Sequence, residues 1–333
     1  MQKVTLKDIA AITGYTINTV SRALKDKPDI SEETKKKICA AADQMGYIRN
    51  SAAGSLRTGQ TLSVGVIAAN VSNPFFSIII REIEQKAYGC GYNVIVFNTY
   101  GDAEIEKKRV RDALSKNVDG IIISPCETEC PSLTYLKQVG IPFVVIGRTN
   151  EDSDINFVTV DDEKGGYLAV KHLLTYGHRQ ILHLSGPENV PSTKYRLDGY
   201  KRALEEFNIP FNPQYVIPVG LECGSCRNVI HQLITNGPPF DAIFAFNDTI
   251  AAEAVYAAYE CKIEIPKELS IVGFDNIERD ILISIPLDSI GTASESVGET
   301  CIDVLMDNIQ NRENWNIHQK TLDVELIKRG SVQ

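Results

Sequence analysis

The feature that most constrains the fold is a series of short apolar runs, separated by helical segments, from Ser63 onward. Runs this apolar are typical of strands that are buried on both faces, as in parallel sheets. Nine runs are predicted strands: SVGVIAA, YNVIVFNT, DGIIISP, FVVIGR, NFVTVD, QILHLSG, YVIPVG, DAIFAFND and LSIVGFDN. Helical segments between them include Phe76 to Tyr88, Glu104 to Ser115, Lys164 to Tyr176, Tyr195 to Phe207 and Thr249 to Tyr259. This alternation predicts an α/β fold.

About ten strands over this length are too many for one compact sheet. We therefore expect two doubly wound parallel-sheet lobes in residues 62–333, with a ligand cleft at the carboxyl ends of the strands.

Side chains that suit a polar ligand follow several of these strands. Carboxylates, amides and guanidinium groups hydrogen-bond hydroxyls, and an aromatic face can stack on a sugar or a base. The candidates are Asn73, Phe75, Phe76, Arg148, Asp161, Arg196, Asn247, Asp248 and Asp275. The alternative is that Asp161, Asp248 and Asp275 cap helices or close loops after buried strands.

The first sixty residues differ from the rest in charge. They hold ten Lys and Arg against six Asp and Glu, net +4, whereas the other 273 residues carry 24 against 37, net -13. Binding a polyanion needs clustered Lys and Arg. The N-terminal segment is therefore the candidate for contact with nucleic acid, and the acidic remainder is not.

Three short helices are predicted in residues 1–48. Thr5, Thr16 and Ser31 stand at favoured N-cap positions, and Asp8 completes a capping box with Thr5. Gly14 and Gly46 stand where the first and third helices should end. The apolar faces are expected to be Leu6, Ile9, Ala10 and Ile12, then Val20, Ala23 and Leu24, then Ile38, Ala41, Ala42 and Met45.

Two helices joined by a tight turn and followed by a supporting helix predict a helix-turn-helix module. The second helix would enter the major groove, where Arg22 can bind guanine, Asn18 adenine and Ile17 a thymine methyl. Hydroxyl and amide residues near helix starts suit phosphate contacts, and these are Thr5, Thr16, Thr19, Ser21, Ser31 and Asn50. The alternative is a small helical bundle with a solvated polar face.

Residues 4–66, above all VTLKDIA, TVSRAL and SLRTG, resemble the N-terminus of the lactose-repressor/galactose-repressor (LacI/GalR) family of bacterial transcription regulators. Shorter motifs continue the resemblance to about residue 276. It implies a helix-turn-helix domain at 1–48, a hinge at 49–61, and an effector-binding and dimerisation domain at 62–333 with the fold of periplasmic sugar-binding proteins. It also implies that the hinge folds when two subunits meet on an operator, and that Leu56 then inserts into the central base step from the minor groove.

The same resemblance implies that Phe76, Arg148, Asp161, Arg196, Asn247 and Asp275 line the cleft between the lobes. The sequence departs from the family pattern at several positions, three of which bear on the hinge and the effector site. Arg49 replaces a common proline, and Gly54, which weakens a helix by about 1 kcal/mol relative to Ala, replaces a longer polar residue. Glu222 stands where an aromatic residue is frequent, so the effector site should favour a polyhydroxylated or cationic ligand.

The expected function is a ligand-responsive transcriptional regulator, a repressor, controlled by a small polar effector such as a sugar or sugar derivative. It should bind double-stranded operator DNA of palindromic sequence as a homodimer, with a tetramer not excluded. The alternatives are a solute receptor without DNA function and a Rossmann-like enzyme. Neither G-x-G-x-x-G after the first strand nor a P-loop occurs, so we expect no catalytic residues and no cofactor.

The sequence also predicts the compartment of the protein and the state of its cysteines. The N-terminus has no apolar signal region and no run approaches ~18 apolar residues, which predicts a cytoplasmic protein with no membrane partner and with reduced thiols. Two cysteine pairs have ligand-like spacing, Cys126 with Cys130 and Cys223 with Cys226. They could form a four-thiolate zinc site, but unpaired cysteines that fill small spaces are commoner, and no metal is expected.

Overall fold

The structure is a computed structural model that describes residues 4–48, 59–127, 130–147, 154–221, 224–277, 285–311 and 315–333. It divides into two compact units, Met1–Thr61 and Leu62–Gln333, and each is described by itself. Seven residues discussed above lie outside the described residues, so their roles stay predictions. They are Arg49, Asn50, Gly54, Leu56, Arg148, Glu222 and Cys223.

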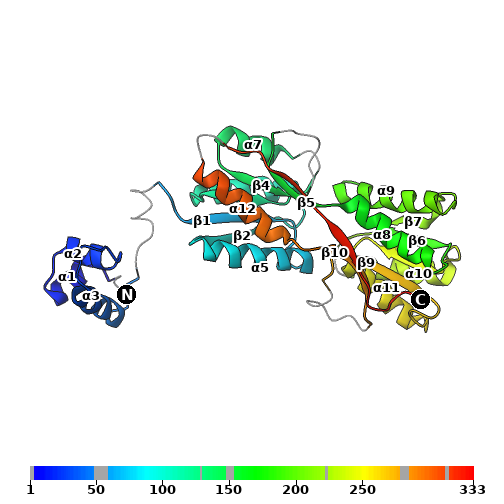
Figure 1. The fold of residues 1–333 in the computed structure, drawn as a ribbon, viewed down its shortest axis with the longest axis horizontal. Coiled ribbons are helices and arrows are strands. Elements are labelled where there is room, and N and C mark those ends of the chain that lie inside the picture. Colours follow the sequence, from blue (N-terminus) through cyan, green and yellow to red (C-terminus); the bar gives the residue numbers. More distant parts are fainter. Residues whose placement is uncertain are drawn as a thin grey trace. The chain divides into compact units, whose positions relative to one another are not determined.

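The first unit contains three helices, α1 (Leu6–Thr13), α2 (Ile17–Ala23) and α3 (Glu32–Gln44), which are drawn in blue in Figure 1. Thr5, Thr16 and Ser31 cap them as predicted, and Thr5 and Asp8 form a capping box. Gly14, at φ 76°, ends α1 in the left-handed conformation. These caps satisfy backbone donors that short helices would otherwise leave unpaired.

One apolar assignment in this unit is wrong. Ile9, Val20 and Ile38 are fully buried and form the centre of the small core, but Ile12 is 67% exposed. The buried stripe of α1 runs through Leu6, Ile9 and Ala10, and Ile12 lies beside this stripe.

The second unit is built from two six-stranded sheets. The first sheet has the order β11-β5-β4-β3-β1-β2, and every pair in it is parallel. Its strands are β1 (Ser63–Ala68), β2 (Asn93–Asn98), β3 (Gly120–Ile123), β4 (Phe143–Ile146), β5 (Phe157–Val160) and β11 (Gln319–Leu322). Helices α5 (Pro74–Gly89) and α12 (Val297–Gln310) pack on one face, and α6 (Ala103–Ser115) and α7 (Pro131–Val139) pack on the other.

The second sheet has the order β12-β10-β9-β8-β6-β7 and is parallel except for β12, which runs antiparallel to β10. Its strands are β6 (Ile181–Ser185), β7 (Val216–Pro218), β8 (Ala242–Ala245), β9 (Ser270–Phe274), β10 (Asp288–Thr292) and β12 (Val324–Ile327). Helices α8 (Asp162–Thr175) and α9 (Pro191–Glu206) cover one face, and α10 (Arg227–Asn236) and α11 (Asp248–Glu260) cover the other. The predicted fold class, a helix-turn-helix domain followed by two doubly wound lobes, is confirmed.

The chain passes between the two lobes three times: after β5, between β10 and α12, and between β11 and β12 (Figure 1). These crossings are bonded to one another. The backbone N–H of Asp161 donates to the carbonyl of Leu322 at 3.0 Å, and that of Ala293 donates to the carbonyl of Asp323 at 3.1 Å. Lys164 adds an ion pair with Asp323. The three crossings therefore form one bonded hinge.

Among the described residues, none of the helices has both the length and the apolar character that crossing a bilayer would require.

Candidate functional site

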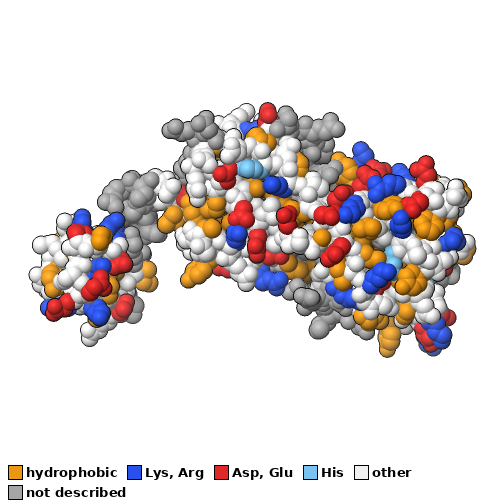
Figure 2. Space-filling view, viewed as in Figure 1, with side chains coloured by type: hydrophobic (Ala, Val, Ile, Leu, Met, Phe, Trp, Pro, Cys, Tyr) orange, Lys and Arg blue, Asp and Glu red, His pale blue; other side chains and the backbone are white. Residues whose placement is uncertain are grey.

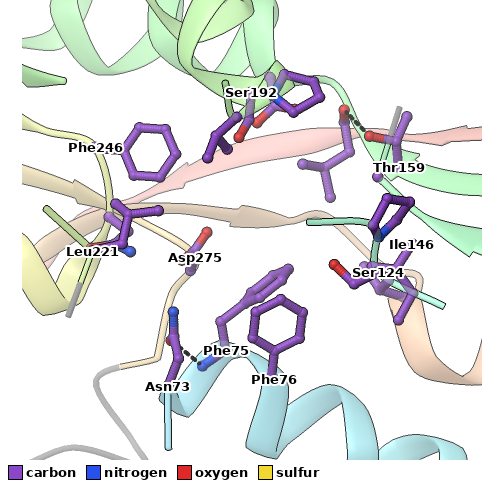
Figure 3. Close-up of a pocket in the computed structure, with 18 of the residues that line it drawn as sticks. Asn73, Phe75, Phe76, Ser124, Ile146, Thr159, Ser192, Leu221, Phe246 and Asp275 are labelled. Atoms are coloured by element: carbon purple, nitrogen blue, oxygen red, sulfur yellow. Dashed lines mark hydrogen bonds between the residues drawn. The ribbon is translucent and has the colours of Figure 1, made fainter. Parts of the chain in front are cut away.

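A cavity of about 170 Å³ lies between the lobes, where the strands of both sheets reach their carboxyl ends (Figure 3). The first lobe contributes residues after β1, β3, β4 and β5, and the second contributes residues after β6, β7, β8 and β9. This position agrees with the predicted cleft, since open parallel sheets bind ligands at this edge.

One wall of the cavity is aromatic. Phe75 and Phe76, in the first turn of α5, meet edge to face with ring centroids 5.3 Å apart. Phe246, which follows β8, lines the cavity from the other lobe, and Figure 3 shows the three rings around one space. Such surfaces stack on the apolar face of a sugar ring or on a flat base.

Arg196 is the buried cation of the site. It is 5% exposed, and its Nε donates to Asp162 Oδ1 at 2.8 Å. Its Nη1 donates to the carbonyl of Phe246, and its Nη2 lies 3.5 Å from Asp275 Oδ1. The guanidinium carbon lies 3.5 Å from the ring centroid of Phe274 and 4.4 Å from that of Phe246. Arg196 therefore fixes two carboxylates at the cavity while aromatic rings hold it in place.

Close packing of α8 against α9 places Arg196 at this depth. A Cβ atom on Gly166 would lie 2.3 Å from the carbonyl oxygen of Arg196, and one on Gly199 would lie 2.1 Å from that of Glu163. Only glycine permits so close an approach of two helix backbones. These two glycines, which the sequence analysis did not single out, are thus part of how the site is built.

Asp275 is the carboxylate at the centre of the cavity. In Figure 3 it lies between Leu221 and the Phe75/Phe76 pair. Burial raises its pKa to about 6, against the opposing effect of the Arg196 charge. Its backbone has φ 95°, a region that non-glycine residues rarely adopt and that is often found at binding sites.

Two asparagines both cap helices and line the cavity. Asn73 Oδ1 accepts from the N–H of Phe75 at 3.0 Å at the start of α5, and Asn247 Oδ1 accepts from that of Ile250 at 2.9 Å at the start of α11. Because the oxygens are used by the helices, the amide nitrogens are the groups left to donate to a ligand. Capping and ligand binding are compatible roles here.

Asp161 and Asp248 have the structural roles considered as the alternative in the sequence analysis, capping a helix and closing a loop. Asp161 caps α8 by accepting from the N–H of Lys164 at 3.0 Å, and among the described cavity residues its place is taken by Asp162. Asp248 is fully buried and accepts from Ser289 Oγ at 2.6 Å and from the N–H of Ile277 at 2.8 Å. Burial raises the pKa of Asp248 to about 7.

Most of the proposed effector residues in the described part of the chain come together. Asn73, Phe75, Phe76, Arg196, Asn247 and Asp275 line the cavity, and Asp161 does not. Sequence reasoning missed Ser124, Glu127, Asp162, Ser192, Leu221 and Phe246. All of these follow strand ends, so considering every residue after each strand would have included them.

The second helix of the first unit presents the predicted DNA-reading face. Val20 and Ala23 are buried against the core, whereas Ile17, Asn18 and Arg22 are exposed. Arg22 is bound by Asp29 through two contacts, Nε to Oδ2 at 2.8 Å and Nη2 to Oδ1 at 2.6 Å.

The predicted phosphate-binding hydroxyls are engaged within the module. Thr5, Thr16 and Ser31 accept from backbone N–H groups at helix starts, and Thr16 Oγ1 lies 2.9 Å from Thr19 Oγ1. Ser21 is partly exposed on α2. Their contact with phosphate stays a prediction.

The described cysteines with ligand-like spacing lie on different lobes, Cys126 and Cys130 on the first and Cys226 on the second. Cys126 and Cys130 flank the buried carboxylate of Glu106, which accepts from the N–H of Cys126 at 2.8 Å and from Cys130 Sγ at 2.9 Å. Cys226 donates from Sγ to Glu253 at 2.7 Å in the second lobe. Burial raises the pKa of Cys126 and of Cys130 to about 12, so both stay as thiols. Within the described ranges, no cluster of three or more His, Cys, Asp or Glu could hold a metal ion.

Two family models match the chain. Residues 5–50 match bacterial regulatory proteins of the lacI family, and residues 61–329 match periplasmic binding proteins and the sugar-binding domain of the LacI family.

Curated proteins and solved structures agree with these models. The chain is 31% identical to the HTH-type transcriptional repressor PurR of Vibrio atlanticus over 334 residues, which cover 99% of this chain and 98% of that one. A Lac repressor dimer bound to operator and the anti-inducer ONPF is 27% identical, with a TM-score of 0.85 over 99% of both chains. A LacI family regulator from Enterococcus faecium with bound ribose is 30% identical, with a TM-score of 0.71 over 81% of this chain and 98% of that one.

Proposed function

Since this chain belongs to the LacI family of bacterial regulatory proteins, we propose that it is a repressor that binds a palindromic operator as a homodimer. A small polar effector, bound in the cavity between the lobes, controls that binding. The protein acts where the chromosome is, in the cytoplasm.

The cavity carries the proposal for the effector. Its described charged residues are Asp162, Asp275, Glu127 and Arg196, three acids against one base. Arg196 is already bonded to two of the acids, so it has little positive charge left for an anion. Carboxylates beside aromatic rings bind the hydroxyl groups and apolar faces of sugars, and they repel phosphate. The effector is therefore a neutral or cationic polyhydroxylated molecule, such as a sugar or an amino sugar.

A purine is the second candidate. The curated relative from Vibrio atlanticus carries the name PurR, and the rings of Phe75, Phe76 and Phe246 offer faces on which a flat base can stack. A base would also use Asp275 as a hydrogen-bond acceptor for its ring N–H groups.

The dimer surface is assigned to exposed apolar residues at one edge of the first sheet and on α11. Val96 lies on the edge strand β2 and is 42% exposed, and Tyr100 follows that strand. Tyr256 and Tyr259, three residues apart on one face of α11, are exposed on the other lobe. Exposed apolar groups at an unpaired strand edge favour association with a second copy.

Effector binding is coupled to DNA binding through the bonded hinge formed by the three crossings between the lobes. A ligand that contacts both lobes stabilises one relative orientation of them, and the first lobe leads directly into the DNA-binding unit. In the dimer, the spacing of the two DNA-binding units then depends on the effector. The proposed hinge segment at 49–61, with Leu56 as a minor-groove wedge, transmits this change.

Two measurements with the full chain test the proposal. Selection from random DNA duplexes should enrich a two-fold symmetric sequence, and failure to enrich any sequence, with and without candidate effectors, would refute operator binding. A thermal-shift panel should identify one ligand class among neutral sugars, amino sugars, sugar phosphates and purine bases, because a ligand at 100 times its Kd stabilises the fold by about 2.7 kcal/mol. A shift by sugar phosphates alone would contradict the charge argument.

A further inference from the structure

The contact between Arg22 and Asp29 leaves one defined edge of the guanidinium group for DNA. A guanidinium presents two edges that each carry two parallel N–H donors, one formed by Nε with Nη2 and one formed by Nη1 with Nη2. Asp29 occupies the first edge, with contacts of 2.8 and 2.6 Å. No described residue bonds Nη1, and Arg22 is exposed. The second edge is therefore the one left for a further partner, with two donors in the plane that the contact with Asp29 fixes.

The loop between α2 and α3 fixes Asp29 in this position. The N–H of Lys27 donates to the carbonyl of Arg22 at 3.1 Å, and the N–H of Ile30 donates to the carbonyl of Lys27 at 3.2 Å. Ile30 packs against the small core, which anchors the loop next to Asp29. Lys35, on α3, forms an ion pair with Asp26 in the same loop, with 2.7 Å between Nζ and Oδ1. The backbone of the loop thus holds the Asp29 carboxylate against α2.

We propose that Asp29 is a positioning residue for base recognition, which orients Arg22 so that its Nη1–Nη2 edge donates to O6 and N7 of one guanine. The inference rests on the proposed DNA-binding function and adds to it a residue that itself touches no base. Guanine is the base whose major-groove edge offers two acceptors side by side, which matches this pair of donors.

Asp29 improves discrimination in two ways. An unpaired arginine has many rotamers and can turn toward phosphates, whereas a guanidinium held in one plane fits only coplanar acceptors. The negative charge of Asp29 also offsets that of Arg22 and repels phosphate oxygens, which lowers the affinity for DNA of any sequence. The hydrogen bond from Arg22 keeps the pKa of Asp29 below its usual value, so the carboxylate stays charged at neutral pH.

The test compares the full-length protein with Asp29→Asn and with a matched control, Asp26→Asn. The control removes the same charge from the same loop and also breaks one ion pair, that with Lys35. Arg22→Ala first identifies which base pair of the selected operator Arg22 reads. Affinities are then measured for operators that carry each of the four base pairs at that position. Thermal unfolding of each variant confirms that the module is folded.

We expect Asp29→Asn to reduce the preference for guanine at that position about tenfold, while its base preferences at other positions stay as in the wild type. The control Asp26→Asn should keep the wild-type preference for guanine. An unchanged guanine preference in Asp29→Asn would overturn the inference. A uniform rise in affinity for all sequences, with the preference intact, would also overturn it, because the ion pair would then only compete with DNA. If the wild-type protein selects no sequence at all, the proposed function fails instead.

Discussion

Asp162 accepts a 2.8 Å hydrogen bond from Nε of Arg196, although the two residues are 34 positions apart and both are buried. Asp275 lies on the other side of the same guanidinium, 3.5 Å from Nη2. One cation thus stabilises two carboxylates whose side chains are almost entirely buried.

Replacing Arg196 should therefore destabilise the protein as well as the site. Arg196→Met leaves two buried carboxylates without their cation, so we expect the free energy of unfolding to fall by about 3–5 kcal/mol. Urea unfolding of the full chain measures this. The double variant Arg196→Met/Asp162→Asn removes one of the stranded charges and should regain part of the loss. Equal stability of the single and double variants would show that the two residues are not coupled.

Asp248 should make stability depend on pH. Burial raises its pKa in the folded state to about 7, above the ordinary value of 3.8, so the folded protein holds a proton that the unfolded chain has released. Stability from this group is therefore greatest at low pH and falls as pH rises. Between pH 6 and 7, above the pKa of Asp275, the free energy of unfolding should fall by about 1 kcal/mol more in the wild type than in Asp248→Asn. The control Asp198→Asn, at a partly exposed position, should keep the wild-type slope, and a slope unchanged in Asp248→Asn would contradict the assignment.

Two glycine replacements, one at the contact between α8 and α9 and one at the end of α5, should have opposite effects on stability. Gly166→Ala forces a Cβ against the backbone of Arg196, so we expect a loss of about 1–3 kcal/mol in stability and weaker effector binding. Gly89→Ala, near the end of α5, meets nothing within 4 Å and should raise stability by up to about 1 kcal/mol. Thermal unfolding and ligand titration of both variants test this. Normal ligand affinity in Gly166→Ala would mean that the helix contact does not set the position of Arg196.

Self-association should depend on the edge of β2. Val96→Asp places a charge in the proposed dimer surface, so sedimentation equilibrium should find a monomer or a dimer at least tenfold weaker, and operator affinity should fall with it. Val139→Asp is a matched control, because Val139 is similarly exposed at the end of α7, outside that surface. If both variants stay as dimeric as the wild type, the interface lies elsewhere.

The sequence predicted the strands that apolar burial defines. All nine expected runs form strands, and the five expected helices are present with shifted ends. The three strands β10, β11 and β12 were missed. The sequence DSIGT of β10 is buried through small and polar residues, β11 is a largely exposed edge strand, and β12 is a short edge strand that is only partly buried. Their positions depend on pairing with strands distant in sequence, which no local pattern records.

Sequence reasoning identified cavity-lining residues where an unusual side chain marked a strand end, and it did not distinguish between adjacent candidates. In VTVDD, two adjacent aspartates follow β5, and only the register of α8 decides that Asp161 caps the helix while Asp162 reaches Arg196. The glycines at positions 166 and 199 have an evident role only when α8 and α9 are seen in contact. Helices α7, α10 and α12 were not among the helical segments named from the sequence.

The ion pair between Arg22 and Asp29 also sets how strongly salt affects recognition. Each lysine or arginine that binds a phosphate releases counterions from the DNA, so it steepens the fall of affinity with ionic strength. In the proposed base contact, Arg22 would meet the DNA already neutralised by its own carboxylate, so it should add sequence discrimination without adding to that fall. For the discrimination that Arg22 supplies, the protein's affinities for operator and for random DNA should fall by the same factor as salt rises. The ratio of the two affinities should therefore persist across a wide range of ionic strength.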